Sequence, residues 1–227
     1  MRKAIFWDFD GTLTYPGHLW SGSLLKALGP LAEAYGVGLE DLRPGLRDCF
    51  PWNPGGRHDL KGPAFWEYMN ARFAEVYAGL GLPLPLAREC AARVRDIVLA
   101  KESYRVRPEA AGALAVCAYK GWRNYILSNN FPELEEVVKR LGLGQFFSGY
   151  VVSALVGANK PDARIFRAAE KTAKFPSLIW LVGDNPIADV QGANNAGWHS
   201  AYLAKPGAPH AGAQVTAGSL SQVLRYF

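Results

Sequence analysis

Cysteine, histidine and long apolar runs are all scarce in this chain of 227 residues, and each scarcity argues against a class of protein. The cysteines, Cys49, Cys90 and Cys117, are odd in number and widely spaced, which disfavours a disulfide framework or a zinc-thiolate site. The four histidines show no metal-ligand spacing. No apolar run approaches the roughly 18 residues of a membrane span, and the first is too short for a signal peptide. We therefore expect a protein of the cytoplasm that does not associate with membranes.

Positive charge is in modest excess but is not clustered. The chain has 25 Lys and Arg residues against 20 Asp and Glu residues, a formal net charge of +5. The basic residues are interspersed with acidic and apolar ones, and no run of Lys and Arg is longer than two residues. Since nucleic-acid-binding domains concentrate their basic residues, we expect no nucleic acid as the main ligand. A mildly positive surface instead favours small anionic substrates.

The most informative stretch is an apolar run, residues 4–7, that ends in two closely spaced carboxylates, Asp8 and Asp10. Residues i and i+2 of a strand point the same way, so both carboxylates can face one site, and Gly11 allows a sharp turn after them. Two adjacent carboxylates repel unless a cation lies between them, and Mg²⁺ with oxygen ligands is the natural choice. Taken alone, the stretch is also compatible with a solvated Asp-rich turn.

Three further motifs follow in order along the chain. An apolar segment ends in Ser128, with Asn129 after it, and Lys160 stands directly before a proline and a predicted helix. A third apolar segment ends in Gly-Asp at Asp184, and Asp189 follows five residues later. Each of these motifs is weak alone. Together with the first motif, and in this order, they cover most of the chain, which resembles the haloacid dehalogenase superfamily of phosphohydrolases.

The resemblance implies an α/β fold, a doubly wound parallel sheet of Rossmann-like topology with an inserted helical cap domain. The segment between the first and second motifs fits such a cap, because it contains amphipathic helical patterns and no convincing strand. We expect a catalytic core of residues 1–16 and 105–227 and a cap of residues 17–104, with cap helices at 19–35, 63–78 and 86–100.

Beyond residue 107, predicted strands and helices alternate, as they do in parallel sheets. Ligands bind such sheets at the carboxyl ends of the strands, where Asp8, Ser128 and Asp184 would meet. Residues 205–212, rich in Gly, Ala and Pro, are a predicted loop. The predicted strands are 4–7, 124–127, 150–152, 178–182 and 200–203, and the predicted helices are 108–119, 132–141, 161–174 and 186–196.

The resemblance also implies a role for each motif residue. Asp8 would attack phosphorus and form an aspartyl-phosphate, since a carboxylate of reference pKa near 3.9 is ionised at neutral pH. Asp10 would protonate the leaving oxygen and later take a proton from water. Ser128, Lys160 and the backbone amide of Asn129 would stabilise the charge on the transferring phosphoryl group.

Mg²⁺ is the cofactor that the resemblance implies. Its expected ligands are Asp8, the main-chain carbonyl of Asp10, and Asp184. Asp189 is expected to support this site through water or through hydrogen bonds to Lys160 rather than by direct ligation. The chain departs from the family pattern at Ala188, where many relatives carry Asn or another acid, and this leaves the surroundings of the metal less defined.

Substrate selection is harder to predict. The loop of residues 50–61 combines aromatic, flexible and cationic residues, so Arg57, His58 or Lys61 could contact the non-reacting end of a substrate. The alternative is an ordinary Pro/Gly-rich loop in which Trp52 packs on the cap helices.

The predicted function is Mg²⁺-dependent hydrolysis of a small phosphorylated metabolite. A phosphoryl mutase would keep all four motifs and is an open alternative, provided that its cap excludes water. A carbon-halogen hydrolase of the same superfamily needs no metal, and its first motif normally lacks the second Asp, so Asp10 and Asp184 argue against it. A non-catalytic binding module has no use for both Asp8 and Asp10. The physiological substrate and the oligomeric state are not predicted.

Overall fold

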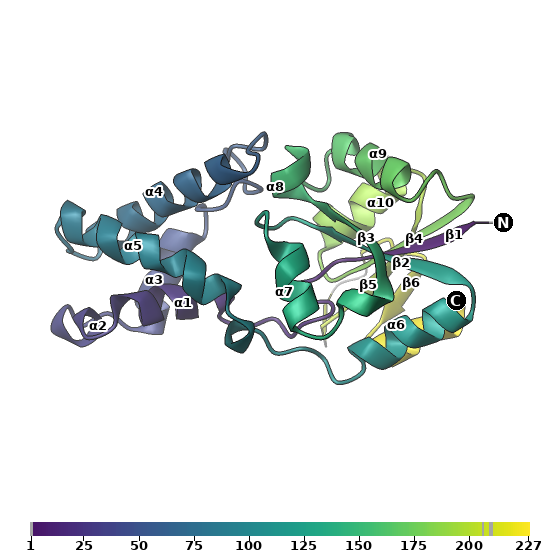
Figure 1. Cartoon of the computed structure of the whole chain (residues 1–227), viewed down its shortest axis with the longest axis horizontal. Coiled ribbons are helices and arrows are strands. Elements are labelled where there is room, and N and C mark those ends of the chain that lie inside the picture. The colour runs from purple at the N-terminus through teal and green to yellow at the C-terminus, as the bar shows by residue number, and fades with distance from the viewer. Residues whose placement is uncertain (1, 206, 209–210) are drawn as a thin grey trace.

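A computed structural model of the chain describes residues 2–205, 207–208 and 211–227. Its centre is a parallel sheet with the strand order β3-β2-β1-β4-β5-β6 (Figure 1). This confirms the predicted doubly wound sheet, and the short edge strand β6 is an addition that the sequence analysis did not predict. The strands are β1 (Lys3–Trp7), β2 (Trp122–Ser128), β3 (Phe147–Val152), β4 (Leu178–Gly183), β5 (His199–Leu203) and β6 (Val215–Ala217).

Helices cover both faces of the sheet and form a separate group beside it. Short 3₁₀ turns lie at Lys101–Ser103, Gly144–Phe146 and Leu224–Tyr226, and a π-helical turn lies at Pro186–Gln191. The helices are α1 (Leu19–Leu28), α2 (Leu31–Ala34), α3 (Leu39–Leu46), α4 (Pro63–Gly79), α5 (Leu84–Leu99), α6 (Ala110–Tyr119), α7 (Leu134–Arg140), α8 (Ser153–Val156), α9 (Ala163–Thr172), α10 (Gly192–Asn195) and α11 (Leu220–Val223).

Strand β1 shows why the centre of the sheet is buried on both sides. Ile5 and Trp7 belong to an apolar cluster with residues of α6, α7 and α11. Ala4 and Phe6 point to the opposite face and pack with residues of α9 and α10. Successive side chains of a strand alternate between faces, so a strand covered by helices on both sides must be apolar throughout. This explains the uninterrupted apolar run before Asp8.

Two predicted helices differ from those in the structure. The helix expected over 19–35 ends at Leu28, because Gly29 adopts a positive φ of 55° and Pro30 follows. A second, short helix, α2, begins at Leu31. The helix expected over 186–196 begins as a π-helical turn, Pro186–Gln191, and becomes α-helical only in α10. Of the predicted loop at 205–212, residues 206, 209 and 210 lie outside the described residues.

Helices α1 to α5 form a helical insert between β1 and β2, on the left of Figure 1, and none of the residues between these two strands belongs to another strand. The two segments that lead into and out of the insert pair with each other. Thr14 and Val106 form an antiparallel bridge, and the Tyr15 N–H donates to the Arg105 carbonyl at 2.8 Å. Among the described residues, no helix is both long and apolar enough to cross a membrane.

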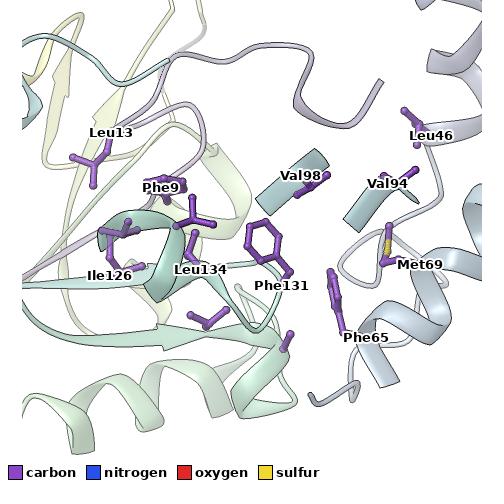
Figure 2. Close-up of a cluster of buried hydrophobic side chains, with 14 of the residues drawn as sticks. Phe9, Leu13, Leu46, Phe65, Met69, Val94, Val98, Ile126, Phe131 and Leu134 are labelled. Atoms are coloured by element: carbon purple, nitrogen blue, oxygen red, sulfur yellow. The ribbon is translucent and has the colours of Figure 1, made fainter. Parts of the chain in front are cut away.

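An apolar interface joins the helical insert to the sheet. Figure 2 shows Phe9, Ile126 and Leu134 on the sheet side facing the insert. The fully buried ring of Phe131 stands between the two parts, 5.7 Å from the Trp66 ring and 6.3 Å from that of Trp20. Because this interface belongs to the same apolar cluster as the core, the insert is held mainly by burial of nonpolar surface.

We expect Phe131→Ala to lower the free energy of unfolding by about 3–5 kcal/mol, the usual cost of removing a buried aromatic ring. The measurement is urea denaturation followed by circular dichroism. Tyr119→Ala, at a side chain that is 93% exposed, is the matched control and should change stability little. A loss for Phe131→Ala no larger than that of the control would contradict the packing role of this ring.

Candidate active site

The four motifs meet at the carboxyl edge of the sheet. Strands β2, β1 and β4 are neighbours and run parallel, so the residues at their ends lie side by side. Ser128 is the last residue of β2, and Asp8 and Asp184 directly follow β1 and β4. Lys160 reaches the same place from the segment before α9. The carboxyl ends of adjacent parallel strands are the usual location of ligand sites in such folds.

Lys160 is buried and holds two of the carboxylates. Its Nζ donates to Asp8 Oδ1 at 2.8 Å, to Asp189 Oδ1 at 2.6 Å and to the Leu127 carbonyl at 2.8 Å. These contacts use all three donors of an ammonium group. Burial by itself lowers the pKa of Lys160, but Asp189 and Asp8 outweigh this effect and raise it overall. The lysine therefore remains charged.

Asn129 positions Lys160. The Asn129 Oδ1 accepts a hydrogen bond from the Lys160 N–H at 2.7 Å, and its Nδ2 donates to the Lys160 carbonyl at 3.0 Å. The side-chain amide is thus fully engaged with the backbone of Lys160. The contact with substrate is expected from the backbone amide of Asn129, so the two roles use different groups of this residue.

Asp8, Asp184 and Asp189 form a cluster that suits a hard cation. Each offers a carboxylate oxygen, and these oxygens lie within 4.8 Å of one another. Asp189 is the most occupied, because Oδ1 accepts from Lys160 and Oδ2 accepts from the Asn185 N–H at 3.0 Å. Asp184 accepts no hydrogen bond from the described residues. This arrangement leaves Asp8 and Asp184 as the better ligands and fits a supporting role for Asp189.

Two glycines make room for these carboxylates. A Cβ at Gly11, whose φ is +84°, would lie 2.3 Å from Asp184 Oδ2. A Cβ at Gly183 would lie 2.2 Å from Asp189 Cγ. The glycine after Asp10 therefore allows both the turn and the close approach of Asp184, and the glycine before Asp184 allows the approach of Asp189.

The carboxylates carry more negative charge than Lys160 offsets. Burial, with Asp8 and Asp189 close by, raises the pKa of Asp184 to about 7. Burial and the charge of Asp8 raise the pKa of Asp189 to about 6, against the opposing effect of Lys160. A divalent cation at this cluster would relieve the repulsion, and the oxygen-only donor set fits Mg²⁺.

Asp10 lies in different surroundings from Asp8. Its Oδ2 accepts a hydrogen bond from Asn130 Nδ2 at 2.8 Å, a neutral donor, whereas Asp8 is paired with an ammonium group. Burial and the charge of Asp8 raise the pKa of Asp10 to about 7, although the Asn130 hydrogen bond lowers it in part. Asn130 was not among the residues expected from the sequence. Its only signal there was a second amide residue directly after the Ser128-Asn129 motif.

Two cavities adjoin these residues. The smaller, of about 260 Å³, is lined by Asp8, Ser128 and Lys160 from the core and by the aromatic side chains Trp20, Phe50 and Trp52 from the insert and its loop. The larger, of about 730 Å³, shares Asp10 and Asp184 with the smaller one. The chemistry-bearing groups and a space for the rest of a substrate are therefore contiguous.

Arg57 is placed differently from the other predicted site residues. It lines neither cavity, its side chain is 63% exposed, and it forms an ion pair with Asp59 at 3.4 Å. His58 contacts Asn159 Nδ2 through Nδ1 at 3.2 Å, and the Lys61 side chain lies against Gly157. Within the loop of residues 50–61, the aromatic side chains approach the carboxylates and the cationic ones do not.

Comparison with known proteins agrees with this geometry. The family model described as haloacid dehalogenase-like hydrolase matches residues 2–197. The chain belongs to the haloacid dehalogenase-like hydrolases. It is 35% identical to the glyceraldehyde 3-phosphate phosphatase of Methanothermobacter thermautotrophicus over 87% of this chain and 83% of that protein. It is 34% identical to the phosphoserine phosphatase of Thermus thermophilus over 55% of this chain, and that match spans about half (52%) of the relative's length.

Solved structures of other haloacid dehalogenase-like hydrolases share the fold. The hydrolase YfnB of Bacillus subtilis, bound to magnesium, superposes with a TM-score of 0.72 at 17% identity, covering 100% of this chain and 99% of that one. A 2-haloacid dehalogenase of Pseudomonas syringae gives 0.70 at 23% identity, covering 99% and 97%. At these identities the likeness concerns the fold alone. Together with the relatives named phosphatases, the family identifies this chain as a hydrolase of the phosphatase type.

The raised pKa of Asp184 predicts a pH dependence of cation binding. With a pKa of about 7, this carboxyl is mostly protonated below pH 6, where the proton competes with Mg²⁺, and mostly ionised at pH 8, where it is free to bind. At pH 8, Mg²⁺ at a hundred times its dissociation constant should raise the melting temperature by about 5 °C or more. The rise at pH 5.5 should be much smaller at the same Mg²⁺ concentration. Differential scanning calorimetry at matched ionic strength measures both.

Asp184→Asn is the control for this measurement, because it should abolish most of the Mg²⁺-dependent rise at pH 8 while preserving side-chain size. Equal rises at both pH values, or an undiminished rise in Asp184→Asn, would count against a cation at this cluster.

Proposed function

We propose that this chain is a Mg²⁺-dependent phosphatase that hydrolyses a small phosphorylated metabolite through an aspartyl-phosphate on Asp8. The observation that carries the proposal is the contrast between two neighbouring carboxylates. Asp8 is held by the ammonium of Lys160, whereas Asp10 meets a neutral amide and has a pKa raised to about 7. One carboxylate is thus suited to attack and the other to proton transfer.

In the first step, a carboxylate oxygen of Asp8 attacks phosphorus while the bond to the leaving oxygen breaks. Lys160 occupies Asp8 Oδ1, and Oδ2 accepts no hydrogen bond from the part of the chain that the structure describes. Asp10 donates its proton to the leaving oxygen, which departs as a neutral alcohol. A pKa near the working pH suits this role, because the protonated acid is both populated and able to give up its proton.

In the second step, Asp10, now ionised, accepts a proton from water. The water oxygen attacks phosphorus, the bond between phosphorus and Asp8 breaks, and inorganic phosphate and the Asp8 carboxylate are released. Asp10 ends protonated, ready for the next substrate. Ser128, Lys160 and the main-chain N–H of Asn129 stabilise the equatorial phosphoryl oxygens in both steps.

Asp8, Asp184 and the main-chain carbonyl of Asp10 would hold Mg²⁺, and Asp189 would support it. When bound, Mg²⁺ supplies positive charge that offsets the charge of the phosphoryl group and of the carboxylates around it. The fit rests on the cluster of carboxylate oxygens and on their excess negative charge.

We further propose that residues 17–104 act as a cap over a catalytic core of residues 1–16 and 105–227. The bridge between Thr14 and Val106, where the chain leaves and re-enters the core, supports these boundaries. A location in the cytoplasm is part of the same proposal and is consistent with three free, buried cysteines.

Two other reactions remain to be distinguished from hydrolysis of a phosphate ester. Enzymes that hydrolyse carbon-halogen bonds share this fold, but their reaction does not need Asp10 as an acid beside the nucleophile. A phosphoryl mutase would use every residue named above, and it differs only in the acceptor of the phosphoryl group. Transfer to water gives inorganic phosphate, whereas transfer to a second substrate oxygen gives an isomeric phosphate ester.

The proposal is tested by phosphate release from 4-nitrophenyl phosphate and from a panel of phosphorylated metabolites, with Mg²⁺ and with excess chelator. Activity should require Mg²⁺, and Asp8→Asn should abolish it because an amide is a poor nucleophile. Undiminished activity in chelator would contradict the metal requirement, and full activity in Asp8→Asn would contradict the nucleophile.

Asp10→Asn should lower kcat by about 10²- to 10⁴-fold, the usual contribution of general acid-base catalysis. It should still bind Mg²⁺, because the main-chain carbonyl is unchanged. The loss should be larger for alkyl phosphates than for 4-nitrophenyl phosphate, whose leaving group needs little protonation. Steady-state kinetics on both substrates provides the comparison, and equal losses would argue against Asp10 as the acid of the first step.

A further inference from the structure

The larger cavity beside the catalytic carboxylates has the properties of a leaving-group pocket. Its volume of about 730 Å³ lies in the range of small-molecule sites, roughly 300–1,000 Å³. It borders Asp10, the proposed acid, and so begins where a leaving oxygen would be protonated. The smaller cavity, at about 260 Å³, has room for the phosphoryl group but for little else.

Three arginine side chains line this cavity. Arg43 and Arg47 reach it from α3 and its C-terminal end, and Arg105 reaches it from the segment that leaves the insert. Apart from the catalytic carboxylates Asp10 and Asp184, the lining contains one acidic residue, Glu102. Three guanidinium groups therefore face one further carboxylate.

The three arginines differ in how far their charge is already compensated. Arg43 donates to Glu40 Oε2 at 2.8 Å and to His18 Nδ1 at 3.0 Å. Because a guanidinium has no acceptor, His18 accepts at Nδ1. Arg47 and Arg105 form no ion pair with any carboxylate of the described residues. These two are the groups available to an anionic ligand.

Arg105 is held in place without being neutralised. Its guanidinium lies 4.3 Å from the centre of the Tyr15 ring, and that of Arg107 lies 4.7 Å from the same ring. Arg107 also donates to the Gly11 carbonyl at 3.0 Å. Stacking on an aromatic ring orients a guanidinium but leaves its in-plane donors free for a carboxylate or phosphate. Arg105 is thus held beside Tyr15 and remains available for binding.

We propose that the substrate of this enzyme carries a second anionic group on its leaving alcohol, a carboxylate or a second phosphate, which Arg47 and Arg105 bind in the larger cavity. The inference rests on the proposed phosphatase function and adds the charge class of its substrate. A guanidinium group binds a carboxylate or a phosphate through paired hydrogen bonds. The proposed ligand group is therefore an oxyanion, planar or tetrahedral, that lies away from the ester being cleaved.

The test compares substrates that differ in this charge alone. 3-Phosphoglycerate and glycerol 3-phosphate have the same three-carbon skeleton, with a carboxylate in one and a hydroxymethyl group in the other. Fructose 1,6-bisphosphate and fructose 6-phosphate provide the second-phosphate arm. In at least one pair, kcat/KM for the member with the extra anion should be about tenfold higher or more, as expected for charge-assisted hydrogen bonds. Raising the salt concentration should reduce this advantage.

Arg47→Gln and Arg105→Gln should each remove most of that advantage, mainly by raising KM for the substrate with the extra anion, and should affect the substrate without it much less. Arg47→Lys should retain part of the kcat/KM advantage that Arg47→Gln loses. Arg88→Gln removes one exposed charge from helix α5, away from both cavities, and is the matched control that should behave as the unmodified protein.

Equal kcat/KM within both pairs, or equal losses on charged and neutral substrates in the two variants, would overturn the inference while leaving the phosphatase function intact. Absence of phosphate release from every substrate, including 4-nitrophenyl phosphate with Mg²⁺, would instead overturn the proposed function on which it rests. The two failures are therefore distinguishable in one set of assays.

Discussion

The rest of the site depends on the hydrogen bonds and ion pairs that the buried ammonium of Lys160 forms. It joins Asp8 of the first motif to Asp189 of the fourth, and its third donor meets the Leu127 carbonyl at the end of β2. Loss of one member of such a buried group leaves uncompensated charge, at a cost of about 3–5 kcal/mol. The hydrogen bonds of Asn129 to the Lys160 backbone secure the lysine from the side of β2. All four motifs thus meet in one hydrogen-bond network.

A single lysine does not balance four carboxylates, and the proposed reactivity of the site depends on this imbalance. Burial, together with the charge left over, raises the pKa of Asp184 and Asp10 to about 7. At Asp184 the excess favours a divalent cation, and at Asp10 it favours a proton that is held at neutral pH and easily given up. The same electrostatic condition therefore accounts for both the metal site and the acid in the proposed mechanism.

Much of the fold and the convergence of the motifs was predictable, because both follow from local rules. An apolar run buried on both faces predicts a central strand, and the end of a parallel strand predicts where its terminal side chain lies. Asp8, Ser128 and Asp184 needed only these rules. The break at Gly29, the π-helical turn at Pro186–Gln191 and the three-residue strand β6 were not predicted. Each is too short, or too dependent on its neighbours, to leave a periodic signal.

The parts of the site that select a substrate were the least predictable, for a different physical reason. Arg43 and Arg47 lie on the helical insert and Arg105 lies about sixty positions further along, so no spacing rule connects them. Arg57, in the most suggestive loop, forms an ion pair in solvent instead. Adjacent strand ends lie together because the strands pair in one sheet. A helix of the insert can carry different residues beside the apolar stripe that it buries, so the apolar pattern does not determine which residues line the cavity. In the proposed enzyme, the chemistry at the sheet edge and the selectivity carried by Arg47 and Arg105 are then separable, since neither arginine forms an ion pair with a carboxylate of the network around Lys160 in the described part of the chain.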